Sequence, residues 1–139
     1  MIIKKKVLFV CTGNACRSHI AEGILRYLAD DKFEVYSAGT TPSQVHPLSI
    51  KVMDEWGIDI SHHTSDHVDD FLDKEIDIVI TLSTLAQELC PSFPGKVEQL
   101  HWDVPDPFPG WVEDSHFLPK FREVRNIIRG RIDTFLQSH

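Results

Sequence analysis

A cysteine and an arginine stand near the start of the chain, separated by five residues, in the segment Cys11-Thr-Gly-Asn-Ala-Cys-Arg17-Ser18. A loop of this length allows successive backbone N–H groups to surround a tetrahedral oxyanion. Arg17 carries a planar fork of donors that suits two oxygens of such an anion. Cys11 is then a candidate nucleophile, because a thiolate is stabilised close to a helix N-terminus and an arginine.

The other residues of this loop also suit an oxyanion site. Gly13 supplies unusual backbone angles, Asn14 tolerates the left-handed region, and Ser18 is close enough to donate a hydrogen bond to the thiolate. A thiolate attacking phosphorus in line would give a phosphocysteine, which is then hydrolysed. The alternative is a buried structural cysteine with a helix-capping asparagine and a surface arginine. The expected oxyanion-binding residues are Thr12, Gly13, Asn14, Ala15, Cys16, Arg17 and Ser18.

The departing oxygen needs a proton, and Asp106 is the candidate general acid. It lies in Val104-Pro-Asp-Pro-Phe108, where the flanking prolines stiffen the loop. Nearby aromatic residues would form an apolar wall that favours the neutral acid; they are Trp102, Phe108 and Trp111. The alternative is a simple Asp-Pro turn, and Asp103 is the second candidate acid.

The hydrophobic pattern predicts the elements that position these groups. Strands are expected at 7–10, 33–38, 76–82 and 97–102, and helices at 20–28, 47–56, 66–72, 84–89 and 116–136. Strands that alternate with helices predict a single three-layer α/β domain, with a four-stranded parallel sheet covered by helices on both faces. Ligands bind beyond the carboxyl ends of such strands, where the 11–18 loop follows the first one.

Length and composition limit the classes of function. The chain has 139 residues and 42% hydrophobic residues, which suits one domain. Its net charge of −7 argues against nucleic acid as a partner. It has no apolar run that would span a bilayer and no signal peptide, so we expect a cytoplasmic monomer without a membrane partner. Three cysteines do not form a secreted disulfide framework.

These motifs together resemble the low-molecular-weight protein tyrosine phosphatase superfamily, and more closely its thiol-dependent arsenate reductases. The 11–18 loop matches the phosphate loop of that superfamily. The resemblance covers almost the whole chain and implies one phosphatase-like domain over residues 1–139. The further matching segments are Ala21-Glu22-Gly23, Ser37-Ala-Gly-Thr40, Gly57-Ile-Asp-Ile-Ser61, Cys90-Pro91, Phe93-Pro-Gly95, His101-Trp102 and Asp106-Pro107.

The resemblance implies roles for the site residues. Cys11 is the nucleophile, Arg17 the oxyanion clamp and Asp106 the general acid, while Asn14 and Ser18 support the loop and the thiolate. The substrate is a small oxyanion, arsenate or phosphate, or a phosphotyrosine protein. No tightly bound cofactor is expected. A reductase would need an external thiol reductant, such as thioredoxin or glutathione, and hence a thiol-redox partner.

The chain departs from the related reductases at one position. They carry two further cysteines after the third strand; here Ser83 replaces the first, and Cys90 matches the second. Serine cannot exchange thiols, so either Cys90 or an external thiol resolves the Cys11 adduct. Three functions stay open: an arsenate reductase, a protein tyrosine phosphatase, and a non-catalytic phosphate-binding module.

Two groups of residues have both a structural and a functional interpretation. Cys16 either fills space in the loop or bonds reversibly to Cys11 and protects it from over-oxidation. Cys90 is either a core cysteine or a redox residue.

The polar cluster after residue 61 has no sulfur ligand and no known metal-binding spacing, so no metal site is expected. His19, just past the loop, is expected on a helix surface; the alternative is that it tunes substrate or solvent access. The cluster comprises His62, His63, Asp66, His67 and Asp69.

Overall fold

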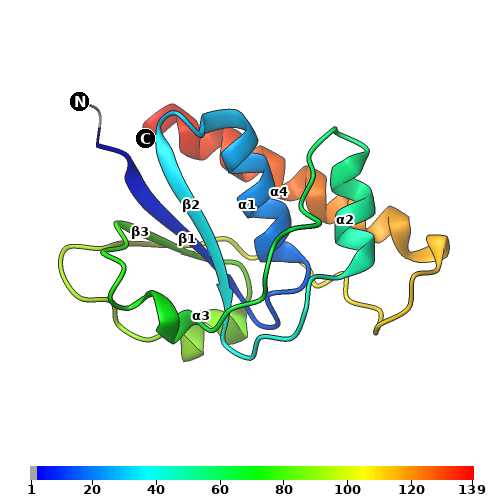
Figure 1. Ribbon diagram of the computed structural model, residues 1–139, viewed down its shortest axis with the longest axis horizontal. Coiled ribbons are helices and arrows are strands. Elements are labelled where there is room, and N and C mark those ends of the chain that lie inside the picture. Colours follow the sequence, from blue (N-terminus) through cyan, green and yellow to red (C-terminus); the bar gives the residue numbers. More distant parts are fainter. Residues whose placement is uncertain (1–2) are drawn as a thin grey trace.

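The computed structural model describes residues 3–139 and contains one four-stranded, all-parallel sheet (Figure 1). The strand order is β2-β1-β3-β4. β1 lies inside the sheet, and its residues 7–10 are fully buried, as expected of a parallel strand covered on both faces. The strands are β1 (Lys5–Cys11), β2 (Phe33–Gly39), β3 (Ile78–Thr81) and β4 (Glu98–His101). The predicted fold class is confirmed.

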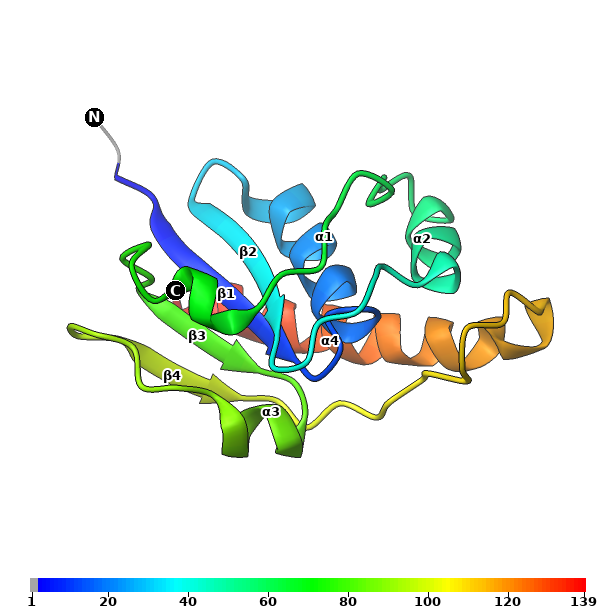
Figure 2. The same cartoon turned by 60° about the horizontal axis from the view of Figure 1, so that its bottom comes forward.

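Helices cover both faces of the sheet (Figures 1 and 2). On one face, α1 and α4 pack against the strands, and α2 packs against both helices. On the other face lie α3 and the short 3-10 helix η1. The helices are α1 (Arg17–Ala29), α2 (Pro47–Asp54), η1 (Val68–Phe71), α3 (Thr84–Leu89), η2 (Ser115–Phe117) and α4 (Leu118–Ser138).

Alternation along β1 divides the core into two clusters. Val7 and Phe9 contribute to the cluster under α1, α2 and α4. Leu8 and Val10 contribute to the cluster under η1 and α3. Successive side chains of a strand point to opposite faces, so this one strand anchors both layers. Cys11, the last residue of β1, is thereby held at the carboxyl edge of the sheet.

The observed elements differ from the predicted ones mainly at their ends. The 66–72 helix is shorter and of 3-10 type, because His67 caps its start by accepting from the Asp69 N–H. The last helix is divided, with η2 preceding α4. Pro119 lies in the first turn of α4, where it costs no hydrogen bond. Within residues 3–139, no helix combines the length and apolar character needed to cross a membrane.

Candidate active site

Cys11 is almost completely buried, and its Sγ lies 3.0 Å from the Oγ of Ser18. The Asn14 side-chain amide donates to the same Ser18 oxygen at 2.7 Å. Since the Ser18 oxygen accepts from Asn14, its hydroxyl proton is free to point at Cys11. Asn14 and Ser18 thus form a chain of hydrogen bonds that leads to the sulfur of Cys11.

The backbone of the 11–18 loop is held from outside. Its carbonyl oxygens accept from the segment after β2: Thr12 from Thr41 N at 2.8 Å, and Gly13 from Ser43 N at 2.9 Å. The Ala15 carbonyl accepts from His46 N at 3.0 Å. Because C=O and N–H point in opposite directions across a trans peptide, these contacts turn the intervening N–H groups toward the inside of the loop. This is the arrangement that an oxyanion requires.

Two backbone features allow this loop to close. Asn14 has a φ of 47°, and its side-chain oxygen accepts from Asp66 N at 2.8 Å, so the left-handed conformation is braced. Gly39, at the end of β2, lies against the loop. A Cβ there would approach the Thr12 carbonyl oxygen to 2.7 Å, which is shorter than any real contact of this kind. Only glycine fits at this position.

Arg17 joins the loop to the segment that carries Asp106. Its Nη1 donates to the carbonyl of Val104 at 3.0 Å, and its Nη2 lies 3.8 Å from Asp106 Oδ2. Asp106 also accepts from the Phe108 N–H at 3.0 Å, and its side chain is 57% exposed. The candidate acid is therefore placed beside the candidate clamp although they are far apart in the sequence.

A cavity of about 190 Å³ lies at the centre of these residues. Cys11, Arg17 and Asp106 all line it, so the structure brings the three candidate catalytic residues to one place. Asp103, the second candidate acid, is exposed and is not among the lining residues. The described residues that line it are Cys11, Thr12, Gly13, Ala15, Cys16, Arg17, Ser43, Asp106 and Phe108.

The aromatic wall differs from the predicted one. Phe108 lines the cavity, and Trp111 packs against it with ring centroids 5.0 Å apart. Trp102 does not belong to this wall. It packs in the core against Phe9 and Phe135, because β4 ends directly before it and directs it inward.

His46 is a site residue that the sequence did not reveal. It is fully buried and stacks on Trp111 with a centroid distance of 5.3 Å. Its Nε2–H donates to the Gly110 carbonyl at 2.8 Å, and its Nδ1 accepts from Leu48 N at 3.1 Å, capping α2. With its backbone bonded to Ala15, this histidine links the oxyanion loop to the 108–111 segment. Its position before Pro47, at a helix start, was the available signal.

The other two cysteines differ in position. Cys16 lines the cavity, and burial raises the pKa of its thiol to about 12. Cys90 is half-buried at the C-terminal end of α3, and burial raises the pKa of its thiol. It lines a separate cavity, between α3 and the β3–β4 pair. Ser83 lies at the opposite end of α3, with its Oγ 3.1 Å from Thr12 Oγ1.

His19 does not lie where the sequence predicted it. His19 is not on the surface: it is fully buried, because its Nε2–H donates to the Asn14 carbonyl at 2.8 Å under the oxyanion loop. Glu22, on the next turn of α1, is also buried. Of the predicted histidine cluster, His63 turns toward these two residues, whereas His67 caps η1. The i, i+3 spacing of His19 and Glu22 was the available signal.

Comparison with known proteins identifies the family. Residues 6–138 match the model of the low molecular weight phosphotyrosine protein phosphatase family. The chain is 42% identical over 135 residues to an arsenate reductase of Halalkalibacterium halodurans, covering 97% of each chain. Its structure is similar to that of an arsenate reductase in the phosphate-binding state, with a TM-score of 0.80, 37% identity, and 96% and 97% of the two chains covered.

A second similar structure is larger. It is a thioredoxin-dependent arsenate reductase of Corynebacterium glutamicum, with a TM-score of 0.72 and 31% identity. The match covers 98% of this chain and 64% of that one. The family model and the relatives each extend over nearly all of the present chain, including the 11–18 loop and Asp106. The chain therefore belongs to the low molecular weight phosphotyrosine protein phosphatase family.

Proposed function

We propose that this chain is an arsenate reductase that uses Cys11 as its nucleophile. The observation that carries the proposal is the shared cavity. It is lined by Arg17, Asp106 and Cys11, whose sulfur lies within hydrogen-bond distance of the Ser18 hydroxyl. Its volume of about 190 Å³ suits a small tetrahedral oxyanion. The identity of 42% to an arsenate reductase over nearly the full length supports this reaction.

In the first step, the Cys11 thiolate attacks arsenic. An S–As bond forms, one As–OH bond breaks, and the departing oxygen takes a proton from Asp106 and leaves as water. Arg17 and the N–H groups of the loop hold the remaining oxygens while charge develops on them. The Ser18 hydroxyl lies within hydrogen-bond distance of the attacking sulfur, at 3.0 Å.

In the second step, another thiolate attacks the Cys11 sulfur. An S–S bond forms and the S–As bond breaks, and its electron pair stays on arsenic. Arsenic is thereby reduced from As(V) to As(III) and leaves as arsenite, while two thiols are oxidised to a disulfide. A further thiol must reduce this disulfide before the next turnover.

The positions of Ser83 and Cys90 favour an external thiol in the second step. Ser83 occupies the end of α3 that touches the oxyanion loop. Cys90 lies beyond the six residues of α3, a separation of about 10 Å along the helix. A disulfide requires Cα atoms within about 7 Å, so Cys90 would reach Cys11 only if α3 unwound. The reductant is therefore a small thiol such as glutathione, or a thioredoxin-type partner.

Hydrolysis of aryl phosphates, as in a protein tyrosine phosphatase, is the second candidate function. The observation that favours it is the aromatic pair Phe108 and Trp111 at the cavity, both more than 40% exposed. Their rings would contact a phosphorylated tyrosine ring. The same nucleophile, clamp and acid would act, and water would attack the phosphocysteine in place of a thiol.

Parallel assays of the two reactions test these proposals. The untagged chain is given arsenate with glutathione or a thioredoxin system, and separately an aryl phosphate without thiol. Thiol-dependent formation of arsenite that is lost in Cys11→Ser supports the reductase. Aryl phosphate hydrolysis without any arsenite formation overturns it in favour of the phosphatase. Phosphate binding without either reaction would identify a binding module.

A further inference from the structure

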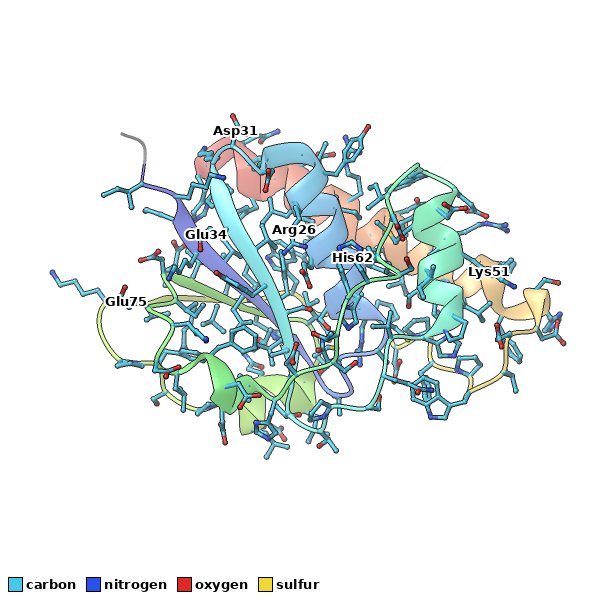
Figure 3. All side chains as sticks on the ribbon, in the orientation of Figure 1. Arg26, Asp31, Glu34, Lys51, His62 and Glu75 are labelled. Carbon is cyan, nitrogen blue, oxygen red and sulfur yellow. The ribbon has the colours of Figure 1, made fainter. Side chains whose placement is uncertain are left out.

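Three potential metal ligands meet behind the oxyanion loop, away from the substrate cavity. His19 and Glu22 come from consecutive turns of α1, and His63 from the segment between α2 and η1. The Nδ1 atoms of the two histidines are 3.1 Å apart. Glu22 Oε1 lies 3.9 Å from His19 Nδ1 and 3.6 Å from His63 Nδ1. In Figure 3, Arg26 and the neighbouring His62 mark this side of α1.

The spacing of these donors fits a small transition-metal ion. The point equidistant from the three atoms lies about 2.1 Å from each, within the range for Zn–N and Zn–O bonds. Imidazole nitrogen and carboxylate oxygen are ligands that such ions accept. A cavity of about 210 Å³, lined by Glu22 and His63, borders the cluster and leaves room for water as a further ligand.

The hydrogen bonds of His19 leave the correct nitrogen available. Its Nε2 lies 2.8 Å from the Asn14 carbonyl, which can only accept, so Nε2 carries the proton and Nδ1 presents a lone pair. A metal-bound histidine characteristically donates its other N–H to a carbonyl or carboxylate in this way. Without an ion, His63 Nδ1–H donates to His19 Nδ1. When an ion binds, the His63 proton moves to Nε2, and the ion takes the place of the proton between the two Nδ1 atoms.

The charge state of the cluster also suits a cation. Burial lowers the pKa of His19 to about 4 and that of His63 to about 3. Burial raises the pKa of Glu22, opposed by a hydrogen bond from Ser37 Oγ to Oε1 and by Arg26, which pairs with Oε2 at 2.7 Å. Oε1 is also the oxygen that faces the two histidines. Asp59 and Asp66 add negative charge near the cluster, and Arg26 adds positive charge.

We propose that His19, Glu22 and His63 form a binding site for a divalent transition-metal ion of the Zn²⁺ class. The site does not take part in the proposed reaction, and its ligands are not among the residues that line the substrate cavity. It is connected to the oxyanion loop through Asn14, whose carbonyl accepts from His19 Nε2–H and whose side-chain amide donates to Ser37, the donor to Glu22 Oε1. A bound ion therefore fixes His19 and stabilises the left-handed turn of the oxyanion loop.

Titration of the untagged full chain with Zn²⁺ tests this site. The Cys11→Ser background removes the cavity thiol that would otherwise compete for the metal. We expect saturable one-to-one binding by calorimetry and a rise in Tm with Zn²⁺. His63→Gln should weaken binding about tenfold or more and abolish the rise in Tm. His62→Gln is the matched control, because it removes the adjacent, exposed ring and should leave both measurements unchanged.

Co²⁺ distinguishes this site from binding by the remaining cysteines. Nitrogen and oxygen ligands give weak d–d absorption alone, whereas a thiolate ligand adds an intense charge-transfer band. We expect the d–d spectrum alone in the Cys11→Ser chain, and its loss in His63→Gln and His19→Gln. A charge-transfer band, no saturable binding, or binding that survives both histidine substitutions would overturn the proposal.

Discussion

The guanidinium of Arg17 lies between the oxyanion loop and Asp106, with Nη2 3.8 Å from Asp106 Oδ2. Its other terminal nitrogen donates to the Val104 carbonyl at 3.0 Å. One side chain thus holds the 104–108 segment over the cavity before any substrate enters. If Arg17 is also the oxyanion clamp, the acid and the clamp are positioned by the same contact.

Arg17→Lys should fail as a catalyst although it keeps the charge. Lysine is a point charge that cannot bind two oxygens and the Val104 carbonyl together. We expect kcat for arsenate reduction to fall about a hundredfold or more, because the contacts strengthen in the transition state. Steady-state kinetics separate an effect on substrate binding from an effect on the chemical step. An unchanged kcat with a raised KM would show that Arg17 contributes only to binding.

Asp106→Asn should slow aryl phosphates with poor leaving groups about a hundredfold, and activated ones far less. The physical reason is that protonation matters most when the departing oxygen is strongly basic. Rates are measured across a series of leaving groups. Asp103→Asn is the matched control, since its side chain is exposed and outside the cavity lining, and it should have no effect. Equal slowing across the series would refute the acid role of Asp106.

Cys11→Ser should abolish both arsenate reduction and phosphate ester hydrolysis while the fold is retained. A serine hydroxyl has no dedicated base here and is protonated at neutral pH. Activity is measured beside the circular dichroism spectrum and Tm of the same sample. Residual turnover above about 1% of the parent, a barrier increase of less than about 3 kcal/mol, is incompatible with a covalent Cys11 intermediate.

Cys90→Ser should leave the rate of arsenate reduction nearly unchanged when glutathione or a thioredoxin system is supplied. Cys90 lines a cavity other than that of Cys11 and is separated from the loop by α3. Mass spectrometry after a single turnover with arsenate and glutathione should detect a mixed disulfide on Cys11. A Cys11–Cys90 linkage in the parent chain would instead demonstrate the internal route and local unfolding of α3.

The ion pairs that hold α2 to α4 should make stability depend on acid pH. Hydrogen bonds from Arg122, opposed in part by desolvation and aided by Arg125, lower the pKa of Glu55 from 4.5 to about 2. A depressed pKa means that this stabilisation is complete above pH 4.5 and is lost as the pH falls toward 2. Tm measured against pH should therefore differ between the parent and Glu55→Gln above pH 4.5, and converge near pH 2.

The control for this measurement is Glu123→Gln, which removes an exposed ion pair of 3.5 Å with Lys120 on the same helix. Surface pairs of this kind contribute little, so its Tm should follow that of the parent at every pH. If Glu55→Gln also follows the parent above pH 4.5, the contacts of Glu55 with Arg122 and Arg125 do not stabilise the fold.

Several features of this protein are formed by residues close together in the sequence and could therefore be predicted from it. A buried strand, the 11–18 loop and α1 follow one another within thirty residues, so their order alone places Cys11 and Arg17 at one oxyanion site. The alternation of strands and helices likewise predicted the parallel sheet, because each element shows its own hydrophobic period. Ser83 at the place of a resolving cysteine was also evident without the structure.

Other features depend on contacts between distant segments, which no local pattern contains. The approach of Asp106 to Arg17 depends on how β4 leads into the 104–108 segment. The burial of Trp102 in the core depends on its packing against Phe9 and α4. His19 and His63 meet because α1 and the segment after α2 pack together, 44 residues apart in the sequence. Local propensity and periodicity determine which elements form, but side-chain packing between those elements decides which functional groups meet.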